Sequence, residues 1–163
     1  MLPSSCLELK HLLSIYRGYV ESHIRYGIRF WGHVNVNPVL VAQKRCLRAM
    51  CGMSRRQSCR SLFVELQVMT VVNLYIYEAA QFVHSNRNVH FHSFSSVHQY
   101  RTRNCESLML GRSKESNLFV KIYNKLPTEL TRTSPTIKFK KRLRELLLHN
   151  CFYSIKEFFS SNF

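Results

Sequence analysis

The sequence contains no aspartate, and its nine acidic residues are all glutamates. Two-metal phosphoryl transfer, Ser-His-Asp hydrolysis and aspartate-held Mg²⁺ sites normally need short, stiff carboxylates beside the reacting atoms. These enzyme classes are therefore disfavoured. We expect no catalytic residue in this chain, and a binding role is favoured instead.

Recognisable metal and redox motifs are also missing. The six cysteines include no Cys-x-x-Cys pair, which is the spacing typical of zinc sites and redox motifs. The histidines at 84, 90, 92 and 98 are followed by no carboxylate before Glu106, so a firm metal site with an ordered second shell is not expected there. Cysteine spacing indicates reduced thiols rather than a disulfide scaffold.

Neither a membrane-spanning run nor a secretory leader is evident. No stretch approaches the ~18 apolar residues of a spanning helix, and the first residues lack a basic region followed by an apolar one. We therefore expect a nuclear or cytoplasmic protein that is not secreted and has no membrane partner.

Positive charge is what the sequence has in excess. The 163 residues include 24 Lys+Arg, and the formal net charge is +15. Residues 1–60 carry ten Lys/Arg against two Glu, and residues 100–163 carry thirteen against five, whereas residues 61–99 are almost uncharged. Such an imbalance indicates a polyanionic partner.

Apolar residues recur with a helical period along most of the chain. This pattern, with cap and stop residues, predicts helices over about 9–27, 37–51, 58–66, 71–84, 117–125, 135–147 and 154–159. Thr70 is the expected cap of the fourth helix, and Gly52 the expected stop of the second. Strand signals are limited to Val89–Phe91 and Thr136–Phe139. The predicted fold class is all-α.

The first helix has two expected faces. At 100° per residue, its inner face collects Leu9, Leu12, Leu13, Tyr16, Tyr19, Val20, His23 and Ile24. Arg17, Glu21 and Arg25 follow the outer face at i, i+4 spacing. Arginines and aromatic rings alternate in Arg25–Gly32, and rings in such a run are optional stacking surfaces for nucleic acid. We favour the core interpretation of the rings, because Tyr16, Tyr19 and Tyr26 lie on or near the apolar stripe. The arginines are interpreted as contacts for a polyanion.

Several motifs, in order and over nearly the whole chain, resemble one family. The residues that carry the resemblance are Leu12–Tyr16, Val20–Ile28, Trp31-Gly32, Gln43–Arg48, Cys51-Gly52, Leu62–Leu66, Leu74–Glu78, His98-x-Tyr100-x-Thr102-Arg103, Tyr123-Asn124-x-Leu126-Pro127, Phe139–Leu143 and Tyr153–Phe158. They are similar to the region that follows the polymerase palm in reverse transcriptases of non-LTR (LINE-like, jockey-type) retrotransposons, which are RNA-directed DNA polymerases.

The resemblance implies a helical, thumb-like bundle followed by a loop-interrupted helical C-terminal region. The expected segments are a thumb-like bundle over 1–66, a central buried helix over 67–85, an irregular His/Ser/Arg-rich connection over 86–116 and C-terminal helices over 117–163. The palm with its Tyr-x-Asp-Asp motif is absent from this sequence, in agreement with the missing aspartates. No cofactor is expected in this chain, because Mg²⁺ would belong to the palm, and we expect no polymerase activity from the isolated chain.

A thumb would hold the template–primer duplex, an RNA–DNA hybrid or DNA duplex, through its phosphates without reading sequence. The candidate nucleic-acid-binding residues are Arg17, Arg25, Arg29, Lys44, Arg45, Arg48, Arg55, Arg56, Arg60, Arg101, Arg103, Lys138, Lys141 and Arg142. Arg101 and Arg103 have an alternative structural interpretation, as helix caps or partners of glutamates.

Two other interpretations stay open. The chain could be a gene-model fragment that works only when joined to an upstream polymerase palm, or a host all-α protein whose helices dock a protein partner. The protein-interaction hypothesis predicts weak, salt-insensitive affinity for nucleic acid.

Overall fold

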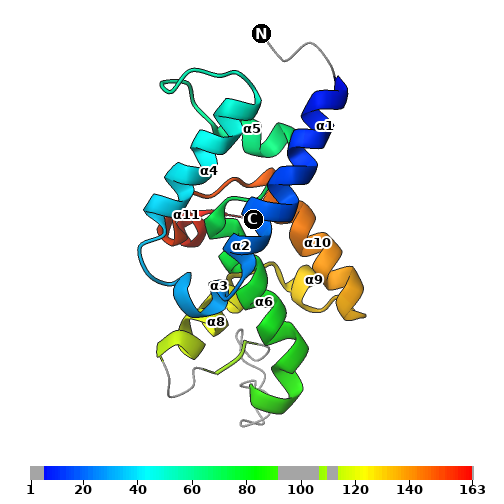
Figure 1. Cartoon of the computed structure of the whole chain (residues 1–163). Helices are drawn as coiled ribbons and strands as arrows, with labels where there is room; N and C mark the ends of the chain where they lie inside the picture. The colour runs from blue at the N-terminus through cyan, green and yellow to red at the C-terminus, as the bar shows by residue number, and fades with distance from the viewer. Residues whose placement is uncertain (1–5, 92–106, 110–113, 163) are drawn as a thin grey trace, which may run out of the picture. The chain divides into compact units, whose positions relative to one another are not determined.

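A computed structural model describes residues 6–91, 107–109 and 114–162 of the chain (Figure 1). Its helices are α1 (Cys6–Ile15), the π-helical η1 (Tyr16–Glu21), α2 (Ser22–Arg25), α3 (Ile28–Trp31), α4 (Asn37–Met50), α5 (Arg60–Glu65), α6 (Val71–His90), α8 (Lys114–Lys125), α9 (Thr128–Thr131), α10 (Thr136–His149) and α11 (Ile155–Ser160). No strand occurs in the described ranges, so the predicted all-α fold is confirmed. Within the same ranges, none of the helices combines the length and apolar character that crossing a bilayer requires.

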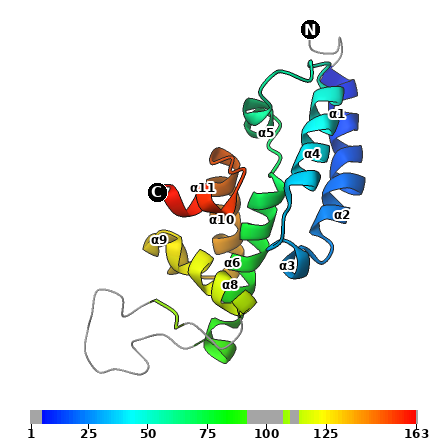
Figure 2. The ribbon, with the colours of Figure 1, turned by 90° about the vertical axis from the view of Figure 1, so that its left-hand side faces the viewer.

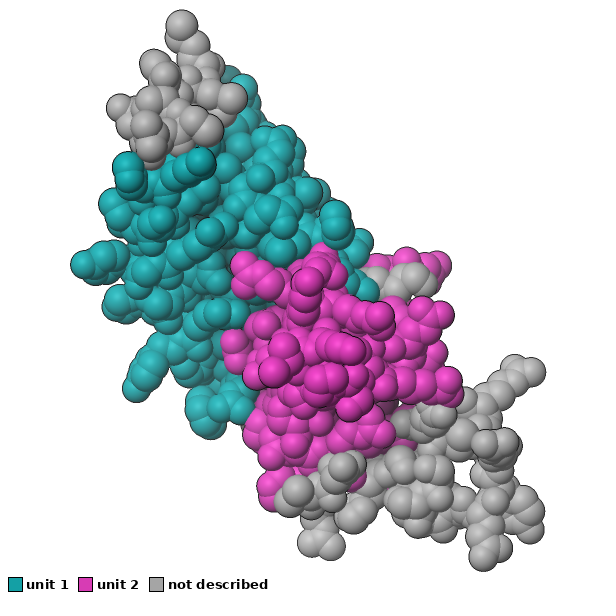
Figure 3. Space-filling model, turned by 90° about the vertical axis from the view of Figure 1, so that its right-hand side faces the viewer, with its two compact units in different colours: residues 1–75, 146–157 teal, residues 76–145, 158–163 magenta. Residues whose placement is uncertain are grey.

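The chain forms two compact units, coloured separately in Figure 3. Unit 1 comprises Met1–Tyr75 and Leu146–Glu157, and unit 2 comprises Ile76–Glu145 and Phe158–Phe163. Helices α6, α10 and α11 each contribute residues to both units. The thumb-like bundle over 1–66 and the division of the chain into four segments remain predictions.

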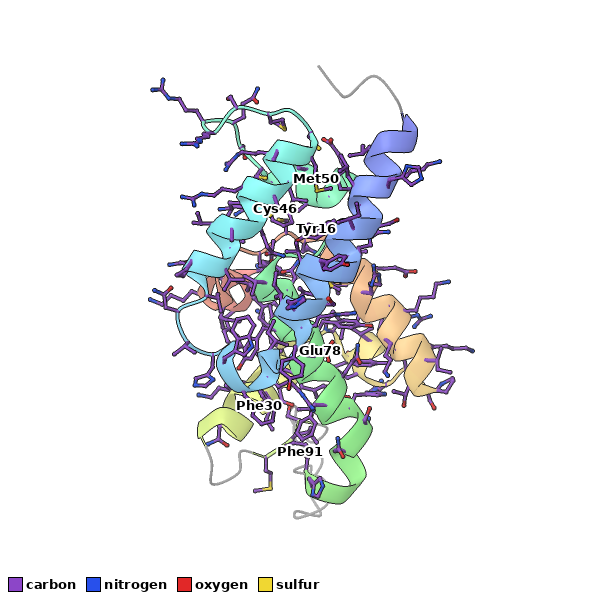
Figure 4. The ribbon with its side chains drawn as sticks, viewed as in Figure 1. Tyr16, Phe30, Cys46, Met50, Glu78 and Phe91 are labelled. Carbon is purple, nitrogen blue, oxygen red and sulfur yellow. The ribbon has the colours of Figure 1, made fainter. Side chains whose placement is uncertain are left out.

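In unit 1, the α1–η1 segment runs alongside α4 (Figures 1 and 2). Leu40, Gln43 and Leu47 are buried on α4 at i, i+3, i+7 spacing, the period of one helix face. Tyr16 of η1 lies opposite this face, with Cys46 and Met50 of α4 near it (Figure 4). One face of α4 is therefore buried, with a glutamine between its leucines.

Thr70 begins α6 as the sequence predicts. Its Oγ1 accepts a hydrogen bond from the Asn73 N–H (3.0 Å) and donates one to the Phe152 carbonyl (2.7 Å). The Asn73 amide in turn donates to the carbonyls of Leu147 (2.6 Å) and Asn150 (2.8 Å). These bonds join the start of α6 to the end of α10 within unit 1, and satisfy polar groups that would otherwise be buried unpaired.

Unit 2 is built around the remainder of α6. Ala79, Ala80 and Val83 of α6 are fully buried, as are Ile122 of α8 and Leu143 of α10. The rings of Phe82 and Phe119 meet edge to face, with centroids 6.0 Å apart. The nearly continuous apolar surface of this helix therefore makes it a core element, as the sequence indicates.

The expected boundaries of the irregular connection are wrong at both ends. Helix α6 continues to His90, so residues 86–90 are helical, and α8 already begins at Lys114. Asn86 donates from its side chain to the Phe82 carbonyl (2.8 Å), and the Phe91 ring packs edge to face on Phe82. These contacts outweigh the low helix propensity of Ser and Asn. The rest of the connection lies outside the described residues.

Both weak strand signals are also wrong. Val89 and His90 end α6, and Thr136–Phe139 form the first turn of α10. The Pro135 carbonyl accepts hydrogen bonds from the N–H groups of Lys138 (2.9 Å) and Phe139 (3.3 Å), which starts a helix there.

The first long helix contains a π-turn that the sequence pattern did not predict. Leu12, Tyr19, His23 and Tyr26, expected inside, are exposed, whereas Glu21, expected outside, is only 7% exposed. A π-turn closes i→i+5 hydrogen bonds and so adds one residue to the turn. The buried positions therefore step from Tyr16 to Glu21 and then to Ile24 and Ile28.

Candidate nucleic-acid interface

Two exposed arginines, Arg55 and Arg56, lie on the turn that follows α4. The helix stops at Gly52, whose φ of 61° allows the Met53 N–H to bond to the Arg48 carbonyl (2.9 Å). We call Ser54–Gln57 the basic loop. Gln57 Oε1 accepts a hydrogen bond from the Ser54 N–H (3.0 Å), which closes the loop on itself.

Arg48 holds the basic loop against α4. Its Nε and Nη2 donate to the Gln57 carbonyl at 3.1 and 2.8 Å. A guanidinium that grips one carbonyl with two N–H groups fixes both position and orientation. Arg48 therefore acts as a positioning residue for Arg55 and Arg56, rather than as a simple surface charge.

Lys44 and Arg60 also make contacts within the chain. Lys44 Nζ lies 3.7 Å from the centroid of the Tyr153 ring, and the Arg60 guanidinium carbon lies 4.4 Å from it. Both are cation–π distances. Arg60 also donates to Glu157 Oε1 at 2.6 Å. The structure thus brings together Lys44 and Arg60, two of the candidate nucleic-acid-binding residues. Both contact the ring of Tyr153 in this chain, and Arg60 also contacts Glu157.

Burial and hydrogen bonding shift the pKa values of this cluster. Partial burial lowers the pKa of Lys44. Burial also raises the pKa of Tyr153 to about 12. For Glu157, burial acts upward, but hydrogen bonds from Arg60 and the Tyr153 N–H hold its pKa below the usual value. The Arg60–Glu157 pair is therefore charged at neutral pH.

The other unit 1 candidates are spread along α1–α4. Arg45 is exposed on the outer side of α4. Arg17 is exposed and makes a long hydrogen bond (3.4 Å) to the Leu66 carbonyl. Arg25 Nε lies 3.9 Å from Glu21 Oε1, and Arg29 is exposed on α3. Arg45 and the two arginines of the basic loop are likewise exposed cations of unit 1.

Unit 2 carries three of the candidates on α10. Lys138 and Lys141 are exposed, and Arg142 donates to Thr133 Oγ1 at 3.2 Å. All three side chains are exposed. Arg101 and Arg103 lie outside the described residues, so their two interpretations stay predictions.

The polar centre of unit 1 was missed by sequence reasoning. Gln43 is fully buried; its Oε1 accepts the Val71 N–H (2.7 Å), and its Nε2 donates to the Tyr16 hydroxyl (2.8 Å) and the Met69 carbonyl (3.3 Å). Burial raises the pKa of Tyr16 well above its ordinary value. The sequence signal that could have placed Gln43 in the core is its position three residues after Leu40 and four before Leu47, on the same helix face.

The unit 1 cysteines whose surroundings the structure describes do not have the features of reactive or paired thiols. Cys46, Cys51, Cys59 and Cys151 are unpaired thiols. Burial raises the pKa of Cys51, Cys59 and Cys151, the last to about 11, so these thiols are protonated and weakly nucleophilic. Among the residues whose surroundings are described, no three His, Cys or Glu side chains converge as metal ligands would.

Comparisons with protein-family models, with curated proteins and with solved structures find no match to this chain.

Proposed function

We propose that this chain binds the phosphate backbone of nucleic acid without sequence preference, through Arg45 and the basic loop of unit 1. One observation carries the proposal. Between Leu9 and Val64, a stretch that includes Arg45 and the basic loop, the only acidic residue is Glu21, and it is buried, so this part of the chain offers cations and no exposed carboxylate. A phosphate backbone is the partner that such a surface attracts.

The basic loop supports the proposal in a second way. Arg55 and Arg56 are both exposed, and Arg48 holds their loop in place. A held loop loses less conformational freedom on binding than a flexible one. Arginine also has the planar fork that matches phosphate oxygens.

The proposal includes the resemblance described above. Under it, the chain is the thumb and following region of a non-LTR retrotransposon reverse transcriptase, alone or joined to an upstream palm. The partner is then an RNA–DNA hybrid or a DNA duplex, held by its shape and backbone.

A protein-interaction role is the alternative, and the exposed Leu12 and Ile15 of α1 favour it. Apolar side chains on an outer helix face can dock another protein. This alternative predicts no dependence of partner binding on Arg55 and Arg56.

Charge-removal variants test the proposed function. Changing Arg55→Gln with Arg56→Gln should weaken binding to two unrelated duplex sequences by the same factor, because phosphate contacts carry no sequence information. The matched control is Lys121→Gln with Lys125→Gln, which removes the same charge from α8 of unit 2. Equal losses in both double variants, or no loss in either, would contradict a site at the basic loop.

A further inference from the structure

Three aromatic rings stand out from one part of unit 1. Tyr19 of η1 is 70% exposed, Tyr26 after α2 is 86% exposed, and Phe30 of α3 is 76% exposed. Phe30 is labelled in Figure 4. We call these three residues the aromatic surface. Large rings are ordinarily among the most buried side chains, because each removes a large apolar area from water.

Chain geometry keeps the three rings near one another. Tyr19 and Tyr26 are seven residues apart on one continuous helical segment, and the Tyr26 N–H still bonds to the Ser22 carbonyl (3.0 Å). Gly27, at φ 64°, then turns the chain into α3. The Trp31 indole N–H bonds back to the Tyr26 carbonyl (3.0 Å), which brings the first turn of α3, with Phe30, beside Tyr26.

The outward position of Tyr19 depends on the π-turn. With a regular α-helical period, Tyr19 would lie near the inner face and Glu21 would face solvent. The π-turn instead places a glutamate inside, 3.9 Å from Arg25, and a tyrosine outside. Side chains placed against the hydrophobic pattern, such as a buried glutamate and an exposed tyrosine, are expected at functional surfaces. π-Turns are frequent at such sites.

The charge around the aromatic surface indicates its partner. Arg17, His23, Arg29 and His33 are exposed in the same stretch, whose single carboxylate is buried. A second copy of this chain would bring like charges together, which disfavours self-association through this surface. Exposed rings interleaved with cations are the combination that proteins use for single-stranded nucleic acid, with bases on the rings and phosphates on the cations.

We propose that the aromatic surface stacks the unpaired bases of a single-stranded nucleic acid. The bases of a duplex are already stacked on one another, so only an unpaired segment can offer their faces to Tyr19, Tyr26 and Phe30. This inference rests on the proposed nucleic-acid binding and extends it: the basic loop holds backbone, and the aromatic surface selects unpaired strands.

The test compares base-containing and base-free strands. The probes are a mixed-sequence oligodeoxynucleotide of about 16 nucleotides, an abasic strand of the same length, and a duplex. The variant is Tyr19→Leu with Tyr26→Leu and Phe30→Leu, in which leucine keeps apolar area but removes stacking. Circular dichroism checks that it folds, and the three single variants replace it if it does not.

We expect the wild-type chain to bind the base-containing strand at least about tenfold more tightly than the abasic strand, a preference that the triple variant loses. Affinity for the duplex should stay within about twofold of wild type, a change of less than 0.5 kcal/mol by the affinity relation. Trp31, the only tryptophan, reports on the surface directly. Its fluorescence should be quenched by the base-containing strand and unchanged by the abasic one.

Other outcomes separate the two proposals. If the triple variant keeps the base preference, the aromatic surface is not a stacking site, although the proposed backbone binding stands. If the wild-type chain binds neither the strands nor the duplex, the proposed function fails and this inference with it. If Trp31 responds only to protein concentration, a second copy occupies the surface and the inference is overturned.

Discussion

Two glycines of unit 1 lie in opposite surroundings. A Cβ built on Gly32 would meet the Tyr75 ring and the Ile28 carbonyl oxygen, whereas a Cβ on Gly18 meets nothing within 4 Å. We predict that Gly32→Ala destabilises the protein by about 1–3 kcal/mol through overpacking. Gly18→Ala should instead stabilise it by about 0.4–1 kcal/mol, because alanine narrows the unfolded ensemble.

Urea denaturation measures both changes, and each glycine variant serves as the control for the other. Equal effects would mean that the tight approach of Tyr75 to Gly32 does not exist in solution.

His84 of unit 2 makes stability depend on pH. Its ring stacks on Phe139 with centroids 3.8 Å apart, and its Nδ1 lies 2.9 Å from the Tyr123 hydroxyl. Burial lowers the pKa of His84, and the nearby Arg87 guanidinium lowers it further. Between the unfolded pKa of about 6.5 and the lower folded one, the unfolded chain binds more protons. The free energy of unfolding should therefore fall as the pH drops below about 6.5.

The variant His84→Phe should flatten this pH dependence, because phenylalanine keeps the stack and does not titrate. His149→Gln, at an exposed position, is the control and should retain the wild-type slope. A His84→Phe protein with an unchanged slope would show that another group causes the acid sensitivity.

At the scale of elements, caps and stops were predictable, whereas helix phase and extent were not. Thr70 and Gly52 act locally, so their neighbours in the sequence suffice to place them. The π-turn of η1 adds a residue to one turn, and the apolar residues around Tyr19 and Val20 fit either register. The extension of α6 to His90 depends on ring contacts of Phe82, whose partners a helical period does not identify.

Gln43 connects three elements of unit 1. It bonds from α4 to Tyr16 of η1 and to the Val71 N–H at the start of α6. Gln43→Leu keeps a side chain of similar size but removes the hydrogen-bond partner of three buried groups, the Tyr16 hydroxyl, the Met69 carbonyl and the Val71 N–H. We predict a loss of at least about 3 kcal/mol in the free energy of unfolding, since each such group costs about 1–3 kcal/mol.

The comparison variant is Gln81→Leu, on a partly exposed position of α6. It should change stability by less than about 0.5 kcal/mol. A Gln43→Leu protein as stable as this control would contradict the proposed polar centre of unit 1.

For the whole molecule, the excess of positive charge could be predicted from the sequence, but the contacts of the individual cationic side chains could not. The cation-rich stretch before Met50 and its near lack of acids are visible in the printed residues. The roles of Lys44, Arg48 and Arg60 were not, because their partners Tyr153, Gln57 and Glu157 are mostly distant in sequence. The core interpretation favoured for Tyr19 and Tyr26 was wrong for the same reason that the π-turn was missed, since both depend on helix phase.

The most direct test of the central claim is the salt dependence of duplex binding by the wild-type chain. Three phosphate contacts, one for each of Arg45, Arg55 and Arg56, predict that the logarithm of the association constant falls with the logarithm of salt concentration at a slope of about −3. Measured binding that follows this slope supports a phosphate-binding surface. A slope shallower than about −2 would leave too few phosphate contacts for the account and contradict it.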